Sequence, residues 1–97
     1  MLSRDEYVLK LKGQLDRWNA DLAAWEARAR AAQADAKQRF DEQLVLLHDQ
    51  REKVLYNLKL LENASAAAWQ DFSRGADQAW VAMGQAVDKA RAHFEKK

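Results

Sequence analysis

Residues 27–37 read Ala-Arg-Ala-Arg-Ala-Ala-Gln-Ala-Asp-Ala-Lys, and this stretch decides how the chain folds. It contains neither Gly nor Pro, and all but one of its residues are strong helix formers. Because nothing in it breaks a helix, we expect one helix to pass through the whole stretch. That helix would join the apolar residues that lie on either side.

The expected helix begins next to Ser3, because Ser3 and Glu6 have the spacing of a capping box. From there apolar residues recur at alternating steps of three and four, the heptad spacing of a coiled coil. An extra step of four from Phe40 to Leu44 unwinds the repeat locally without ending it, so we expect a helix over about residues 4–62. This row of residues, which we call the apolar seam, comprises Val8, Leu11, Leu15, Trp18, Leu22, Trp25, Ala29, Ala32, Ala36, Phe40, Leu44, Leu47, Arg51, Val54, Leu58, Leu61 and Ser65.

The only interruption expected after Ser3 is a turn at residues 63–65. Asn63 tolerates the left-handed conformation that ends helices, and Ser65 can cap a second helix over about residues 66–96. The seam continues there at spacings of three and four, with recurrences every 11 residues that favour a nearly straight helix. Its residues are Trp69, Phe72, Ala76, Trp80, Met83, Val87, Ala90 and Phe94.

The two expected helices differ in length, which predicts assembly. At about 1.5 Å per residue the first would be roughly 90 Å long and the second roughly 46 Å, so a hairpin leaves half of the first helix bare. We therefore expect a single all-α domain over 1–97 that forms an antiparallel, domain-swapped dimer centred near Ala32 and Gln33, with three helices in every cross-section. The residues expected to carry self-association are Leu11, Leu15, Trp18, Leu22, Trp25, Ala29, Ala32, Ala36, Leu47 and Trp80.

The alternative is a monomer in which the chain bends near Gln33 and three helices of about 30 residues make the same contacts within one chain. In either arrangement Trp80 would pack near Leu47 and Trp18. We favour the dimer because residues 27–37 have an unbroken helical composition.

Composition excludes several other classes of protein. The chain has 16 basic and 15 acidic residues, evenly spread, so it lacks the basic stripe typical of nucleic-acid binding. Ile and Thr are absent, which disfavours a β-sheet, and no apolar run approaches a membrane span. The start of the sequence is charged rather than apolar and there is no Cys, so we expect a cytoplasmic protein without a secretory signal.

No group of residues points to catalysis. His48 and Glu52 have a spacing that can hold a metal, but His93 is far away and two ligands do not make a site. There is no Gly-rich phosphate loop and no pattern of nucleophile and base, so we expect no enzyme, metal or cofactor. The four Trp residues fall on the seams, which favours the core of a bundle over a lipid surface.

Three segments carry a resemblance to a known family: residues 14–20 (Gln-Leu-Asp-Arg-Trp-Asn-Ala), residues 32–37 (Ala-Gln-Ala-Asp-Ala-Lys), and residues 68–72 (Ala-Trp-Gln-Asp-Phe), followed by Gly75 and Ala79-Trp80. In their order and separation they resemble short bacterial coiled-coil proteins of the stress response. That resemblance implies a small cytoplasmic helical protein with no catalytic residues. We expect a non-enzymatic scaffold that acts by self-association and by binding a protein partner through its helices. The alternative is reversible binding to a membrane surface by apolipoprotein-like amphipathic helices.

Overall fold

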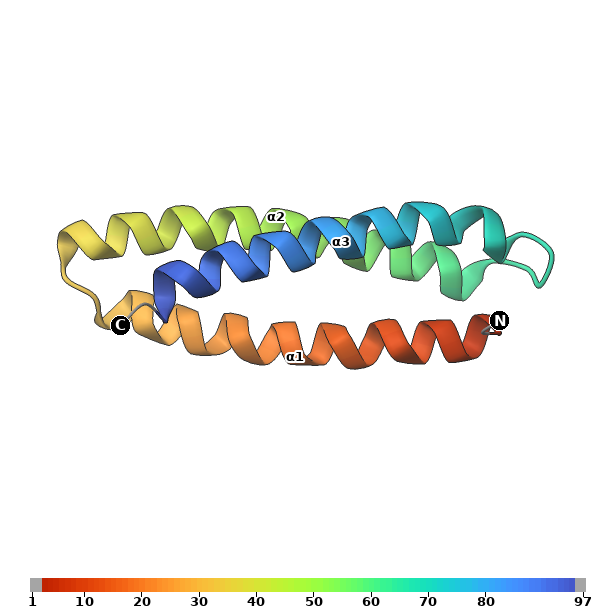
Figure 1. The fold of residues 1–97 in the computed structure, drawn as a ribbon, viewed down its shortest axis with the longest axis horizontal. Helices are drawn as coiled ribbons and strands as arrows, with labels where there is room; N and C mark the ends of the chain where they lie inside the picture. Colours follow the sequence, from red (N-terminus) through yellow and green to blue (C-terminus); the bar gives the residue numbers. More distant parts are fainter. Residues whose placement is uncertain (1–2, 96–97) are drawn as a thin grey trace.

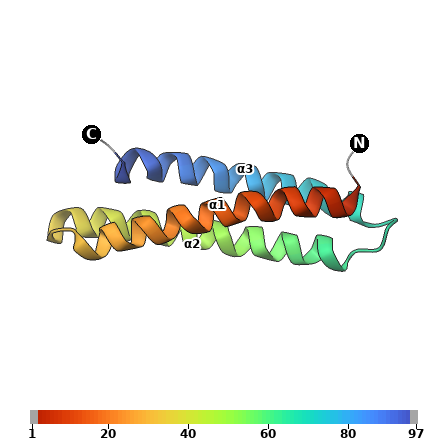
Figure 2. The same cartoon turned by 90° about the horizontal axis from the view of Figure 1, so that it is seen from below.

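The computed structural model describes residues 3–95, and it confirms an all-α fold. Three helices lie side by side, α1 (Arg4–Ala31), α2 (Ala34–Asn63) and α3 (Trp69–Phe94), in a rod of 51 × 18 × 17 Å. α2 runs antiparallel to both of the others, so α1 and α3 point the same way (Figures 1 and 2). No helix in residues 3–95 combines the length and the apolar character that crossing a membrane requires.

The start of α1 is as predicted. The Ser3 hydroxyl accepts a hydrogen bond from the backbone N–H of Glu6 at 3.3 Å, and it lies 3.0 Å from the Glu6 carboxylate. This capping box satisfies a backbone donor that the first turn of a helix leaves without an intrahelical partner. α1 therefore begins at Arg4.

The predicted continuous helix over 4–62 is wrong at Ala32 and Gln33. Both residues are extended, with φ −77° and ψ 152° at Ala32 and φ −72° and ψ 162° at Gln33, and the chain reverses there. Helix propensity among good helix formers differs by only tenths of a kcal/mol per residue, whereas each large apolar side chain covered by a neighbouring helix contributes about 1.5–3 kcal/mol. Folding α2 back over α1 covers the bare seam within one chain, as in the bent alternative.

The second turn lies slightly later than predicted. α2 ends at Asn63, but no residue from 3 to 95 has the positive φ expected of Asn63; instead Ala64 is extended. Ser65 does cap the following turn, because its hydroxyl accepts from the N–H of Ala68 at 3.1 Å. α3 begins at Trp69 rather than 66 and ends at Phe94, while the predicted end at residue 96 lies outside the described residues.

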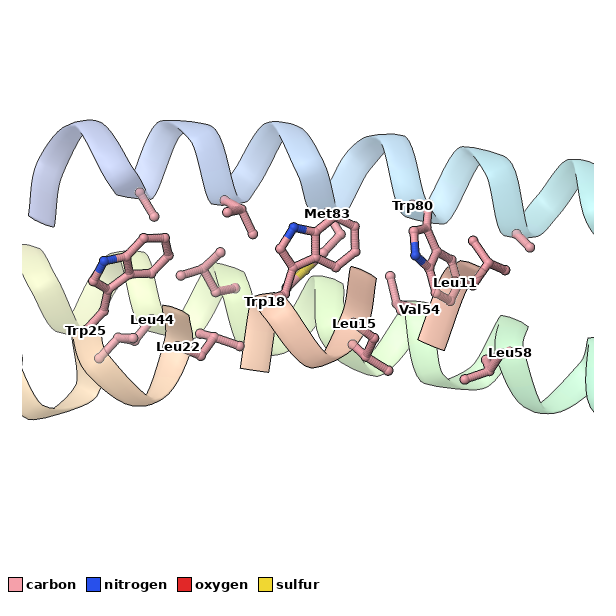
Figure 3. Close-up of a cluster of buried hydrophobic side chains, with 14 of the residues drawn as sticks. Leu11, Leu15, Trp18, Leu22, Trp25, Leu44, Val54, Leu58, Trp80 and Met83 are labelled. Carbon is pink, nitrogen blue, oxygen red and sulfur yellow. The ribbon is translucent and has the colours of Figure 1, made fainter. Parts of the chain in front are cut away.

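The apolar seams of the three helices meet in one core (Figure 3). The predicted seam positions of α1 from Val8 to Ala29 are all buried, and so are those of α3 from Ala76 to Phe94. Of the two remaining seam positions of α3, Trp69 is half-buried and Phe72 is 38% exposed. Phe72 lies in the first turn of α3, next to the connection from α2.

Candidate functional site

The residues predicted to join two copies of the chain lie inside one copy. Eight of them are buried between α1, α2 and α3, and Ala32 and Ala36 are half-buried at the bend. Within a single chain, therefore, this set forms the core. The eight buried residues are Leu11, Leu15, Trp18, Leu22, Trp25, Ala29, Leu47 and Trp80.

Trp18 and Trp80 meet at the middle of the bundle, as the sequence predicted. Their ring centroids are 6.3 Å apart with planes inclined at 38°, and both rings project into the core (Figure 3). Trp18 also lies beside Gly84, where an added Cβ would be 3.7 Å from the indole ring. The indole N–H of Trp80 is buried and has no acceptor among the described residues. Such a group costs stability, so the site is held by packing rather than by hydrogen bonding.

The end of the bundle near the bend is closed by aromatic rings. Phe94 lies between two of them: its centroid is 5.3 Å from that of Trp25 and 4.5 Å from that of Phe40. The indole N–H of Trp25 donates to the Glu95 carboxylate at 3.1 Å, and the Arg91 guanidinium lies 5.5 Å from the Trp25 ring centroid. Offset aromatic pairs and cation–π contacts of this kind fasten α3 to both other helices.

At the opposite end a phenol links α1 to α3. The Tyr7 hydroxyl donates to the carboxylate of Asp77, and its ring centroid lies 6.0 Å from that of Trp69. Burial raises the pKa of Tyr7 well above its usual range, and the hydrogen bond to Asp77 and the negative charge of that carboxylate raise it further. Nearby, Arg4 donates to the Ala64 carbonyl at 2.6 Å and so satisfies a backbone acceptor at the end of α2.

A polar pair interrupts the core between α1 and α2. Arg51 occupies a seam position and is half-buried, and its Nε donates to Oδ1 of Asn19 at 2.7 Å. Within residues 3–95 no carboxylate lies within 4.0 Å of this guanidinium. The spacing of the seam located Arg51, but nothing in the sequence identified Asn19 as its partner.

His48 takes part in no metal-like cluster. Its Nε2 lies 3.0 Å from a carboxylate oxygen of Glu26 on α1 rather than joining Glu52, its neighbour one turn along α2. The part of the chain from Ser3 to Glu95 contains no group of three His, Cys, Asp or Glu side chains that could hold a metal. One surface hollow of about 450 Å³ is lined by a single helix, between Ala34 and Val45, and so offers no converging side chains.

The features that sequence reasoning missed are apolar side chains on the outer faces. Four of them, Leu9, Val45, Leu46 and Val81, adjoin a seam position in the chain, so a search for the seam passes over them. With the core already complete, they are unpartnered surface rather than unfinished packing. The large exposed apolar residues are Leu9, Val45, Leu46, Tyr56 and Val81, together with Phe72, which the sequence had placed on the seam.

Comparison of the chain with protein-family models, with curated proteins and with solved structures finds no match.

Proposed function

We propose that this chain is a non-enzymatic, cytoplasmic helical interaction protein that acts through contacts of its helix faces with a second copy and with partner proteins. The observation that carries the proposal is the set of large apolar side chains on the outer faces of a bundle whose core is complete. Val45 is 67% exposed and Leu46 53% exposed, on adjacent positions of α2. Because both side chains are already partly covered, full burial by a partner would contribute roughly 1–2 kcal/mol for each.

The test compares surface variants with the wild type. Leu9→Ser, Val45→Ser and Leu46→Ser remove exposed apolar groups and leave the core intact, so helix content and melting temperature should stay near wild type. Cross-linking in cells should then recover fewer proteins with the variants than with the wild type. Ala24→Ser, a similar change at an exposed position of α1, serves as the control. Equal recovery with all four variants would contradict the proposal.

Self-association by exchange is the second part of the proposal. If Ala32 and Gln33 became helical, α1 and α2 would form one long helix. Two copies could then make the contacts of α1 with α2 and α3 between chains, while α2 and α3 still pack on each other within each chain. Two features support such exchange: the link is only two residues long, and Gln33 caps α2 without a side-chain hydrogen bond. Light scattering would reveal the dimer by its mass.

A role in the stress response rests on the resemblance of residues 14–20, 32–37 and 68–72 to short bacterial stress-response proteins. Deleting the gene should reduce survival under at least one stress, such as heat, desiccation or oxidant. Unchanged survival under all of them would contradict this role.

Binding to a lipid surface is the alternative. Trp18, Trp25 and Trp80 are buried, so lipid binding would require the bundle to open and present its seams to the membrane. Trp fluorescence with anionic vesicles is the discriminating measurement. A changed emission together with co-sedimentation would favour the lipid surface, and the absence of both would exclude it.

A further inference from the structure

The outer face of α3 carries a second row of regularly spaced residues, opposite the seam. Arg74, Gln78, Val81, Gln85 and Asp88 follow one another at steps of four, three, four and three, so they lie along one side of the helix. All five are exposed, whereas Ala76, Trp80, Met83 and Val87, which alternate with them in the chain, are buried. We call these five residues the outer stripe.

The order of residues in the outer stripe is symmetric about Val81. Arg74 lies seven residues before Val81 and Asp88 seven residues after it, while Gln78 lies three residues before it and Gln85 four residues after it. The ends therefore carry opposite charges, the intermediate positions carry the same amide, and the centre is a valine that is 59% exposed. When two copies of this face meet in antiparallel orientation, each charged end lies against the opposite charge. An interface with a two-fold axis requires such self-complementarity.

From this symmetry we infer that the outer stripe pairs with the outer stripe of a second copy, antiparallel, about a two-fold axis that passes next to Val81. This inference rests on the proposed self-association and names a surface for it. Arg74 of each copy would face the partner's Asp88, and the two Val81 side chains would meet. Gln78 would lie about 1.5 Å along the helix axis from the partner's Gln85. The strip of contact would be roughly 21 Å long, at about 1.5 Å per residue.

The charges at the ends of the stripe have no competing ion-pair partner. Among residues 3–95, neither Arg74 nor Asp88 lies within 4.0 Å of an opposite charge, although Arg91 on the same helix pairs with both Asp21 and Glu95. Arg74 and Asp88 can therefore pair with a partner without breaking an existing ion pair. Opposite charges across an interface fix register and disfavour wrong pairings.

A shallow hollow beside the stripe extends the apolar surface. It has a volume of about 290 Å³ and lies between α2 and α3, where Leu46, Ala82 and Ala86 contribute apolar groups next to Gln85. Pairing would cover Val81, which is one of the large apolar side chains that the bundle leaves exposed.

Charge reversal tests the pairing. Arg74→Asp places two carboxylates opposite each other at both ends of the interface, and Asp88→Arg does the same with two guanidinium groups. Either change should weaken dimerisation by roughly tenfold or more. The double variant, Arg74→Asp with Asp88→Arg, restores both pairs in reversed order and should restore the dimer. Arg28→Asp, an equal change of charge at an exposed position of α1, should leave dimerisation unchanged.

Sedimentation equilibrium from about 10 µM to about 1 mM, a range suited to a weak dimer, measures these differences at low salt. A second measurement uses the absence of Cys in the chain. Val81→Cys should form a disulfide-linked dimer quickly under mild oxidation, because its counterpart lies opposite at the axis, whereas Val45→Cys on α2 should react slowly. Circular dichroism verifies that each variant remains folded.

Any one of four results would overturn the inference. A wild-type chain that stays monomeric over the whole range has no outer-stripe dimer, although the proposed binding of other proteins would stand. A dimer unaffected by single charge reversal forms elsewhere, for example by exchange at Gln33, and preserves the proposed self-association. A double variant that fails to dimerise, or equal cross-linking at Val45→Cys and Val81→Cys, removes the two-fold axis.

Discussion

Replacing Gln33 with proline distinguishes a chain that bends at Gln33 from one in which a continuous helix passes through it. In the bent chain Gln33 has φ −72°, close to the value of about −65° that the proline ring imposes. The preceding Ala32 has ψ 152°, which lies in the range that a following proline favours. Within residues 3–95 the Gln33 N–H donates to no backbone carbonyl, so its loss removes no hydrogen bond of this kind.

The expected effects have opposite signs in the two arrangements. In the bent monomer, proline restricts only the unfolded chain and should raise the free energy of unfolding by about 0.4–1 kcal/mol. In a straight helix through Gln33 it costs about 3 kcal/mol per chain, or about 6 kcal/mol for the two chains of an exchanged dimer. At about 1.4 kcal/mol per tenfold change, the dimerisation constant would fall by roughly 10⁴.

Urea denaturation of the dilute protein and light scattering at high concentration measure the two effects. Gln38→Pro is the matched control, because Gln38 is an exposed residue inside α2 and proline there breaks the helix in either arrangement. We expect Gln38→Pro to destabilise the bundle by about 3 kcal/mol. If Gln33→Pro destabilised the dilute protein as much as the control does, the chain would not bend at Ala32 and Gln33, and the reasoning would be refuted.

Three further outcomes are expected. Trp18→Leu and Trp80→Leu should each lower the free energy of unfolding by roughly 1–3 kcal/mol, and their effects should not add, because the rings are in contact; strict additivity in urea melts would contradict the contact. Gly13→Ala should stabilise α1 by about 1 kcal/mol, since its Cβ would meet nothing within 4 Å. Gly75→Ala should stabilise the protein less than Gly13→Ala, because its Cβ would lie 3.2 Å from Oδ1 of Asn57 on α2. Equal increases of the melting temperature would show that the Asn57 side chain moves aside freely. The raised pKa of Tyr7 means that the folded state favours the neutral phenol, so this contribution to stability is complete below about pH 10 and is lost as the pH rises further. The difference in stability between wild type and Tyr7→Phe should therefore shrink above pH 10, and a constant difference would argue against the link to α3.

The sequence predicted which residues form the core, because periodicity reports which side of a helix is covered. Leu11, Leu15 and Leu22 recur at helical spacing and are buried, whatever element covers them. The Ser3 cap could be predicted for a similar reason, since a capping box involves only residues three apart. Local patterns thus suffice for local structure and for the choice of face.

The bend could not be predicted, because the straight and bent chains satisfy the same pattern. Ala32 and Gln33 favour a helix only weakly over an extended conformation, and the core contacts can form within one chain or between two. Closing them within one chain avoids the loss of translational and rotational freedom that association costs. That entropy is a property of the whole assembly, and no residue in the stretch from 27 to 37 encodes it.

The hydrogen-bond acceptors of Tyr7 and Trp25 could not be predicted, for a different reason. Tyr7 with Asp77 and Trp25 with Glu95 are each separated by 70 residues, and they meet only because two turns of particular length place α3 beside α1 in one register. A shift of a single residue at either turn would rotate these side chains to other faces. The sequence therefore identified the aromatic residues as core but could not identify their hydrogen-bond acceptors.

The outer stripe illustrates how a candidate site can be hidden by the pattern that predicts the fold. A search for hydrophobic periodicity in α3 finds the row from Ala76 to Phe94, because those residues are apolar. The second row has the same spacing but only one apolar member, Val81, so it gives no hydrophobic signal. Its symmetry becomes informative only once the structure shows that the first row is covered by α1 and α2, which leaves Arg74 and Asp88 unpaired within residues 3–95 on a face that no other helix of the chain can reach. For a helix in a completed bundle, the arrangement of charges on the uncovered face is therefore where specificity for a second chain can be encoded.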